Sequence, residues 1–501
     1  MLDAASPTRA SLAQLLSLAW PLIVSQSIWT LQIVLDRIFL AQSSTESVGA
    51  GMASVMIFWM LLGFFQFTTN YATTFVAQYT GAGQHERVGP IIGQALWFAL
   101  ASGLLFVLLI PWSETLVAWV GHEEALQQLE ATYFRWMCGA ALPFLILAAT
   151  TSFFAGRGET RQVMYINLVG LVVNGFLDYV LIFGKWGFPE MGIAGAGLAT
   201  LAGGWVAALL SLVLLLRPHC IRLYRTGIGW GLDLALLGRL LYFGVPQGLG
   251  TAVETASFAL FLLFIGRLGS DDLAATSIAC TLNLIAFLPM MGVGQAVEVL
   301  VGQSLGEDRP QQAERFVWTG LSLAVGFTAL LALMYALMPL TLTSPFRPAE
   351  LSTSWPAVEA RIPLLLWFVA AYCLFDSVQL IFAYALRGAG DTRFVTLVTA
   401  ALAFPLMVLP AWAAQHLGWS MYVAWAFVSL YLVILASVLY LRFAAGAWKR
   451  MRVIELATTP PSEPPPVQTP ENFVGPRQPK LVDTARLPRP TGGETALGSK
   501  R

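Results

Sequence analysis

Charged residues are scarce in this sequence, and their scarcity excludes an ordinary water-soluble fold. Only 11% of the 501 residues are charged, whereas 57% are hydrophobic. A soluble domain usually carries about a quarter charged residues, so lipid is the simplest place for this much apolar surface. The formal net charge is zero, and we therefore expect no nucleic-acid partner.

Cysteine and histidine are also rare, and neither forms a recognisable site. The four cysteines and four histidines are widely spaced and show no pairing or metal-ligand pattern, so we interpret them as packing or loop residues. A cleavable signal-peptide pattern is absent as well. The first apolar segment starts near Leu15 and is long enough to be retained as a membrane span.

Long apolar runs dominate what is present. They are about 20 residues or longer, not alternating runs of about 10, which favours membrane-spanning helices over barrel strands. In lipid the backbone must satisfy its own hydrogen bonds, and a helix does so within one segment. The sequence predicts an all-α integral membrane protein with twelve spans, at residues 15–41, 48–79, 91–110, 133–154, 163–183, 193–216, 234–265, 274–305, 317–338, 364–386, 395–414 and 424–441.

Lysine and arginine are distributed unevenly among the loops that join these spans. If the N-terminus is cytoplasmic, every inner loop carries basic residues, and the outer loops hold little beyond Lys185, Arg267, Arg347 and Arg361. Short loops rich in lysine and arginine remain on the cytoplasmic side of a membrane. We therefore expect a multi-pass protein of the plasma membrane (the bacterial inner membrane) with both termini cytoplasmic.

The apolar part of the chain consists of two similar halves. Three motifs recur in the same order, the first two at one offset of about 225 residues: Trp20-Pro21 and Val245-Pro246, Val76-Ala77-Gln78 and Val301-Gly302-Gln303, and Gly156-Arg157-Gly158-Glu159-Thr160-Arg161 and Gly388-Ala389-Gly390-Asp391-Thr392-Arg393. Six spans per half is an even number, so the halves form a parallel repeat about an axis along the membrane normal. We predict two pseudo-symmetric six-helix lobes, 1–230 and 231–450. The proline-rich, polar segment 451–501 should form a disordered cytoplasmic tail.

Acidic residues inside the predicted spans are candidates for function, because a charge at mid-membrane costs roughly 2.5–3.5 kcal/mol. There are five of them: Asp36, Asp178, Glu254, Glu298 and Asp376. Their usual roles in membrane proteins would be proton relay or sodium binding.

Four polar residues of the first half should lie together. At about 1.5 Å per residue, Asp36, Asp178 and Thr200 each lie roughly 8 to 10 Å below the outer end of their spans. Asn174 precedes Asp178 by four residues and so shares its helix face. Two carboxylates, an amide oxygen and a hydroxyl suit sodium, and the carboxylate pair equally suits a proton. The sequence predicts a cation site here, with Na+ as the candidate metal ion.

The second half carries its own acids. Glu254 and Asp376 should lie near mid-membrane, and Glu298 should lie nearer the inner end of its span. With no basic residue expected at this depth, the three acids would attract cationic substrates, protons or sodium. Pro21 and Pro246 lie inside spans, where a proline kinks the helix, and the bend is either static or mechanically active.

Several of these features resemble the multidrug and toxic compound extrusion family, MATE. The similarity covers residues from about 12 to 441 and is carried by the two prolines, the loops Gly81-Ala82-Gly83 and Leu386-Arg387-Gly388-Ala389-Gly390-Asp391-Thr392-Arg393, and the stretch NGFLDYVLIFGKWGFPEMGIAGAGLAT at 174–200. The resemblance implies twelve helices in two lobes that form a V, and exchange of sodium or protons for organic, often cationic, compounds.

Residue roles follow from the same resemblance. It implies a first-lobe cation site at Asp36, Asn174, Asp178 and Thr200, with Pro21 as the bending point. NorM-like members also use second-lobe acids, where this chain has Glu254 and Asp376. Glu298 departs from the family pattern, so the resemblance assigns it no role.

The sequence therefore predicts a secondary active exporter, an antiporter of Na+ or H+ and small organic cations or drugs. We expect a monomer in membrane lipid with no cofactor other than the coupling ion. A lipid-linked oligosaccharide flippase of the related superfamily is the alternative, but such proteins usually have about fourteen spans and a basic cavity. An intramembrane enzyme would call for a clustered histidine, serine or paired-aspartate motif. Asp178 and Asp376 lie in opposite halves and no histidine lies within a span, so we predict that the protein is not an enzyme.

Overall fold

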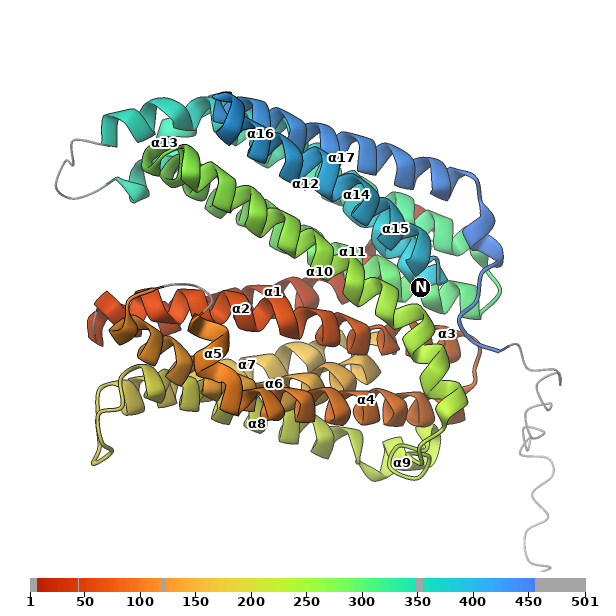
Figure 1. The fold of residues 1–501 in the computed structure, drawn as a ribbon. Helices are drawn as coiled ribbons and strands as arrows, with labels where there is room; N and C mark the ends of the chain where they lie inside the picture. The colour runs from red at the N-terminus through yellow and green to blue at the C-terminus, as the bar shows by residue number, and fades with distance from the viewer. Residues whose placement is uncertain (1–6, 44, 119–121, 348–354, 456–501) are drawn as a thin grey trace, which may run out of the picture. The chain divides into compact units, whose positions relative to one another are not determined.

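Long helices form most of the part of the chain that the computed structural model describes, residues 7–43, 45–118, 122–347 and 355–455. The helices of the first half are α1 (Pro7–Ser43), α2 (Thr45–Asn70), α3 (Ala72–Gly81), α4 (Val88–Leu109), α5 (Ser113–Ala118), α6 (Glu124–Gly156), α7 (Thr160–Ile182), α8 (Ile193–Leu215) and α9 (Pro218–Tyr224). Those of the second half are α10 (Leu234–Leu268), α11 (Ser270–Gly306), α12 (Pro310–Leu337), α13 (Pro339–Thr343), α14 (Trp355–Ala389), α15 (Thr392–Ala403), α16 (Leu409–Leu417) and α17 (Met421–Ala444) (Figure 1).

Each predicted span coincides with helical structure. Within the described residues, eleven helices are long and apolar enough to cross a membrane. The second predicted span is divided into α2 and α3. The eleventh consists of α15 and α16 joined by a π-helical turn at Phe404–Val408, where Pro405 lacks the backbone donor of a regular helix.

The boundaries differ from the predicted ones where polar residues continue a helix beyond its apolar run. α6 begins at Glu124 and α14 at Trp355, each nine residues before the predicted span. The short helices α5, α9 and α13 were not predicted, since they are too short to produce an apolar run. The prediction of a disordered tail at 451–501 is wrong for its first residues, because Val453 and Ile454 are buried against first-lobe side chains. The rest of that segment, beyond Glu455, lies outside the described residues.

Each half packs as a bundle around one central helix. In the first lobe α6 contacts α2, α4 and α8, and in the second lobe α14 contacts α11, α12 and α17. Both central helices are the fourth span of their half, so the repeat in the sequence is also a repeat in packing (Figure 1). Two pseudo-symmetric six-helix lobes are therefore confirmed for the described part of the chain.

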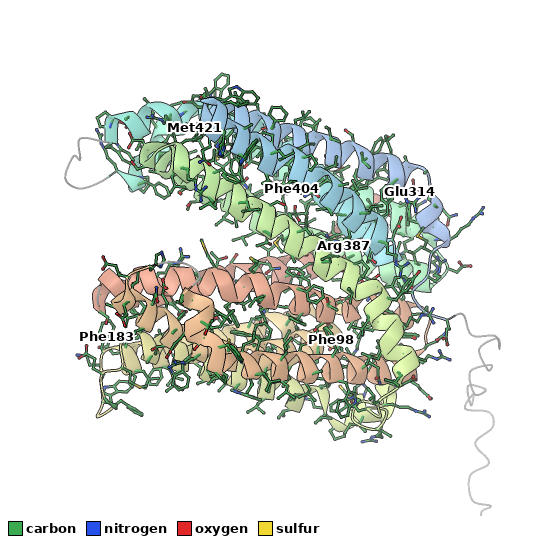
Figure 2. All side chains as sticks on the ribbon, viewed as in Figure 1. Phe98, Phe183, Glu314, Arg387, Phe404 and Met421 are labelled. Atoms are coloured by element: carbon green, nitrogen blue, oxygen red, sulfur yellow. The ribbon has the colours of Figure 1, made fainter. Side chains whose placement is uncertain are left out.

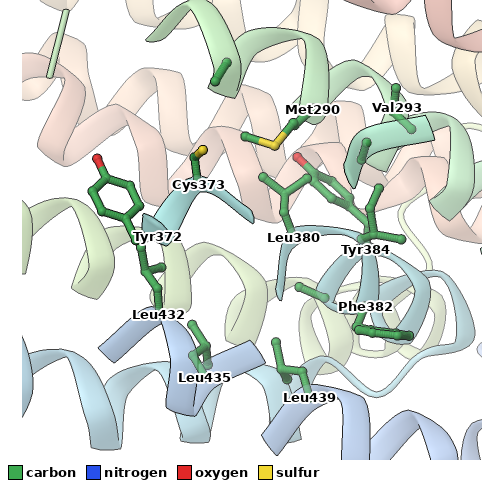
Figure 3. Close-up of a cluster of buried hydrophobic side chains, with 14 of the residues drawn as sticks. Met290, Val293, Tyr372, Cys373, Leu380, Phe382, Tyr384, Leu432, Leu435 and Leu439 are labelled. Carbon is green, nitrogen blue, oxygen red and sulfur yellow. The ribbon is translucent and has the colours of Figure 1, made fainter. Parts of the chain in front are cut away.

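The second lobe has a dense apolar core between α11, α14 and α17. Met290 and Val293 of α11 and Leu435 of α17 are among its buried side chains (Figure 3). Gly294 brings α11 against α14: a Cβ atom at this position would lie 2.3 Å from the ring of Tyr384. Such packing leaves little room for added atoms.

The two lobes meet through the first two helices of each half, with α1 on α11 and α2 on α10. Glycines permit the close approach. A Cβ atom at Gly292 of α11 would lie 2.7 Å from the backbone nitrogen of Ile23, and one at Gly248 of α10 would lie 2.3 Å from the carbonyl oxygen of Phe64. The two contacts are equivalent under the repeat, because α1 and α2 correspond to α10 and α11.

The Gly294 contact generates a stability prediction. Gly294→Val should destabilise the protein by about 1–3 kcal/mol, because the added atoms overpack the α11–α14 contact. The measurement is the midpoint of thermal unfolding in detergent. Gly326→Val is the matched control, since nothing lies within 4 Å of a Cβ atom built at Gly326 of α12. Equal midpoints for the two variants would contradict this account of the core.

Candidate functional site

The four polar residues predicted for the first lobe lie together in the structure. Asp36 comes from α1, Asn174 and Asp178 from α7, and Thr200 from α8. The carboxyl groups of Asp36 and Asp178 are within hydrogen-bonding reach of each other, and Asn174 lies beside Asp178. The amide of Asn174 donates a hydrogen bond to the hydroxyl of Thr200 at 3.4 Å. Asp178 and Asn174 are fully buried.

Most of the oxygens in this group have no donor. Among the described residues, neither carboxylate oxygen of Asp178, nor Oδ1 of Asp36, nor Oδ1 of Asn174 has a hydrogen-bond partner. Buried acceptors are normally satisfied, because an unpaired polar group in a low-dielectric interior is unfavourable. A converging set of unpaired oxygens is the arrangement that a small cation or a proton would complete.

Small residues bring α7 and α8 together at this group. A Cβ atom at Gly203 of α8 would lie 2.9 Å from Cβ of Asn174 and 3.1 Å from the carbonyl oxygen of Gly170. Only glycine fits such an approach without displacing a helix. Gly203, in the middle of α8, is therefore part of what positions Asn174 and Thr200.

Tyr133 of α6 also belongs to this group, and the sequence analysis missed it. Its side chain is buried, and its hydroxyl lies within hydrogen-bonding reach of Thr200 and close to Asp36 and Asp178. In the sequence Tyr133 stands at the edge of an apolar run, where a tyrosine is typical of the membrane interface. The true start of α6 at Glu124 places it inside the helix.

In the second lobe, Glu254 of α10 and Asp376 of α14 lie within electrostatic reach of each other. Asp376 is buried and accepts a hydrogen bond from the amide of Gln379 at 3.1 Å. Tyr431 of α17 lies near both acids, and its buried hydroxyl has no partner in the described part of the chain. Tyr431 gave no sequence signal, since an isolated tyrosine in an apolar span usually serves packing.

Glu298 of α11 lies apart from this pair, where the two lobes meet. Its carboxylate accepts a hydrogen bond from the hydroxyl of Thr74 of α3 at 2.6 Å, so the contact crosses from one lobe to the other. Glu298 is buried, with 6% of its surface exposed. Glu298 was predicted nearer the inner end of its span than Glu254 and Asp376, and in the structure it has an environment separate from theirs.

That environment is a cavity of about 440 Å3 between the lobes. Among the described residues that line it, Glu298 is the only one with a charged side chain. Trp29, Trp59 and Phe144 form an aromatic wall, with the two tryptophan rings 4.6 Å apart and Phe144 within 6 Å of both. The remaining polar lining is uncharged and consists mainly of glutamine, asparagine, serine and threonine: Ser25, Gln26, Gln66, Asn70, Thr73, Thr151, Ser152, Asn167, Gln247, Thr251, Thr255 and Gln295.

Arg387 lies in the last turn of α14 and adds a basic charge that acts on two of the second-lobe acids (Figure 2). It is half-buried, and its charge reaches both Glu254 and Glu298. None of the five predicted acids forms an ion pair with it or with any other described residue. The acids therefore remain available to a mobile cation.

The two predicted bending prolines lie inside continuous helices, Pro21 in α1 and Pro246 in α10. The carbonyl oxygen of Pro246 accepts a hydrogen bond from the hydroxyl of Thr396 at 2.5 Å. α1 carries Pro21, the cavity residue Trp29 and Asp36 in that order, so one helix connects the cavity to the first-lobe acids.

Comparison with known proteins agrees with the repeat. The family model MatE matches the chain twice, at residues 21–180 and 246–413. The two matches begin at the two repeated prolines and cover most of both lobes.

Individual relatives match over most of their length. "Probable multidrug resistance protein NorM" of Mesorhizobium japonicum is 28% identical over 443 residues, which cover 87% of this chain and 94% of the relative. "Multidrug resistance protein PmpM" of Pseudomonas aeruginosa is 31% identical over 397 residues, which cover 78% of this chain and 81% of the relative.

Solved structures show the same fold. One described as the outward-facing conformation of a multidrug resistance MATE family transporter has a TM-score of 0.80 at 16% identity, covering 90% of this chain and 100% of the other. A likeness at this identity concerns the fold, whereas the family match rests on the sequence. The chain therefore belongs to the MATE family of membrane transporters.

Proposed function

We propose that this transporter is a multidrug exporter that exchanges Na+ or H+ for small organic cations across the bacterial inner membrane. Both termini would be cytoplasmic, as the distribution of basic residues indicates. The observation that carries the proposal is the group of buried, unpaired oxygens at Asp36, Asn174 and Asp178. The names of the relatives, which are multidrug resistance proteins, support the substrate class.

The first-lobe group suits either coupling ion. Oxygen ligands from carboxylates and an amide suit a hard cation such as Na+. A proton placed between Asp36 and Asp178 would equally remove their mutual repulsion, because two close carboxylates in a poorly solvated site do not both remain charged. The coupling ion is a transported partner here, and the proposal requires no resident cofactor.

The cavity suits an organic cation. Glu298 would supply the only full charge among its described lining residues, and Trp29, Trp59 and Phe144 would supply ring faces that attract cations and apolar groups. Small-molecule sites typically combine aromatic and apolar side chains with polar groups that fix the orientation of the ligand, and this cavity offers both kinds. A lipid-linked pyrophosphate would meet a negative charge instead, which argues against the flippase alternative.

α1 offers a route for coupling. α1 also carries Trp29, which lines the cavity, and Pro21, which lies eight residues before Trp29. A cation bound at Asp36 would change the electrostatic force on this helix. One charge that moves down a potential of 100 mV releases about 2.3 kcal/mol. That energy would sustain a gradient of more than tenfold for a neutral substrate. For a singly charged substrate exchanged one for one, the two charges cancel, and the concentration gradient of the ion would supply the energy instead.

Transport by the purified protein tests the proposal directly. Efflux of ethidium from proteoliposomes would be measured with a sodium gradient and a proton gradient imposed separately. We expect one of the two gradients to drive efflux. If neither gradient drives it, the antiport mechanism is wrong.

Removing one first-lobe charge should uncouple transport from the ion. We expect Asp178→Asn to lower gradient-driven efflux at least tenfold, because the neutral amide cannot hold the cation with Asp36. The assay is the efflux described above. Asp271→Asn, at the start of α11 and outside this group, is the matched control and should transport normally. Normal coupling in Asp178→Asn would move the ion site to Glu254 and Asp376.

Removing the cavity charge should weaken substrate binding. We expect Glu298→Gln to bind ethidium at least tenfold more weakly, because a charge-assisted contact is worth about 1.5–3 kcal/mol. Binding can be followed by quenching of tryptophan fluorescence, since Trp29 and Trp59 line the cavity. Glu359→Gln, on α14 but not among the described lining residues, is the matched control. An unchanged affinity in Glu298→Gln would exclude Glu298 from the substrate site.

A further inference from the structure

Two motifs of the sequence repeat contact each other across the lobes, and the cation sites do not account for them. Gln78 near the end of α3 donates a hydrogen bond to the carbonyl oxygen of Gly388 at 3.0 Å. Gln303 near the end of α11 donates to the carbonyl oxygen of Gly156 at 2.8 Å. Gln78 and Gln303 are equivalent positions of the repeat, and so are Gly156 and Gly388. Each lobe therefore contributes one donor and one acceptor to a reciprocal pair.

The backbone around this pair follows the same symmetry. A Cβ atom at Gly81 would lie 2.0 Å from the carbonyl oxygen of Gln303, and one at Gly306 would lie 2.2 Å from the carbonyl oxygen of Gln78. A Cβ atom at Gly302 would lie 2.9 Å from Cβ of Ala77, which is its equivalent in the first half. Equivalent residues contact each other only on a symmetry axis, so α3 and α11 cross there.

We infer that Gln78 and Gln303 form a symmetric latch that holds the lobes together at this end of the transporter. The inference rests on the proposed exporter, which must open alternately on its two sides. Opening at this end would separate the ends of α3 and α11 from Gly388 and Gly156, and both glutamine bonds would break. The latch thus sets how often the end opens, and the glutamines are positioning residues for transport.

The latch is connected to the cavity through α3. Tyr71, immediately before α3, donates a hydrogen bond to the carbonyl oxygen of Arg387 at 3.0 Å. Thr74, one turn before Gln78, donates to Glu298 at 2.6 Å. Residues 71, 74 and 78 share one helix face. A cation bound at Glu298 would reduce the negative charge that attracts the Thr74 hydroxyl, and so would weaken a bond beside the latch.

Gln78 also holds the segment that follows α17. Its side-chain oxygen accepts a hydrogen bond from the backbone nitrogen of Val453 at 2.8 Å. Val453 and Ile454 are buried among first-lobe side chains, whereas Trp448 is buried in the second-lobe core. The segment therefore crosses from one lobe to the other over Gln78. The side chain of Gln303 has only its bond to Gly156 among the described hydrogen bonds, so a change of this side chain affects the latch without this segment.

The test measures the distance between spin labels at Glu86 and Gln311, which are exposed and follow α3 and α11. The labels are attached to cysteines introduced at these two positions after the native cysteines have been changed to serine. The variants are Gln78→Met, Gln303→Met and the double variant, which keep the side-chain length but remove the hydrogen bonds. Gln162→Met is the matched control, since no described hydrogen bond joins the Gln162 side chain to the second lobe.

We expect each single variant to raise the ratio of molecules whose labelled lobe ends are separated to molecules whose lobe ends are in contact. The increase should be roughly 3- to 10-fold, as the loss of one hydrogen bond predicts. The double variant should raise it further, and Gln162→Met should leave it unchanged. If the double variant does not fold, the comparison of Gln303→Met with Gln162→Met carries the test. If folded Gln303→Met shows the same distances between the two labels as the unchanged protein, the proposal of a latch is wrong.

The measurement needs neither substrate nor gradient, so it separates the latch from the proposed function. Distances that respond to Gln303→Met support the latch even if no gradient drives ethidium efflux. Normal antiport with unresponsive distances would keep the exporter and overturn the latch.

Discussion

In a membrane interior a polar group must find its partner within the protein, and the whole structure depends on this constraint. The backbone meets it by forming long helices, and most buried hydroxyls meet it by donating to a carbonyl oxygen one turn earlier, as Thr150 does. Both carboxylate oxygens of Asp178 and Oδ1 of Asp36 do not meet it, because the described residues supply these atoms with no donor. A cation or a proton is the partner that this arrangement lacks.

The repeat is symmetric in its packing and asymmetric in its polar residues. α6 and α14 occupy the same central position, and Gln78 and Gln303 make equivalent bonds. The acids do not follow the repeat. The first lobe pairs two aspartates with an asparagine and a threonine, whereas the second pairs Glu254 with Asp376 and adds Glu298 at the lobe interface. Under the proposed function, symmetric packing would let the two lobes move alike, and the unequal acids would let ion and substrate bind at different places.

The contacts between the lobes are numerous but individually weak. A hydrogen bond between neutral groups contributes only about 0.5–1.5 kcal/mol, which is comparable to the energy that one charge gains in the membrane potential. The glycines at the crossing of α3 and α11 add close packing without adding charge pairs. An interface of this kind can hold one conformation and still be reversed by the binding of an ion or a substrate.

The sequence alone determined the features that depend on local composition. Long apolar runs defined the spans, the repeated motifs defined two lobes, and intramembrane acids identified the residues that have to be explained, since burial of a charge in lipid is unfavourable wherever the helix lies. Helix boundaries were less well predicted where polar residues extend a helix, as at the start of α6.

Only the tertiary structure decided which side chains meet. It placed Tyr133 beside Thr200 and Tyr431 near Asp376. It set Glu298 against Thr74 and not beside the other second-lobe acids. It also brought the charge of Arg387 within reach of Glu254 and Glu298. It also showed that the repeated glutamines bond to the repeated glycine loops. These contacts join residues up to hundreds of positions apart, and they depend on the angle and rotation of each helix. Apolar faces that meet lipid and apolar faces that meet another helix have the same composition, so the sequence does not distinguish them.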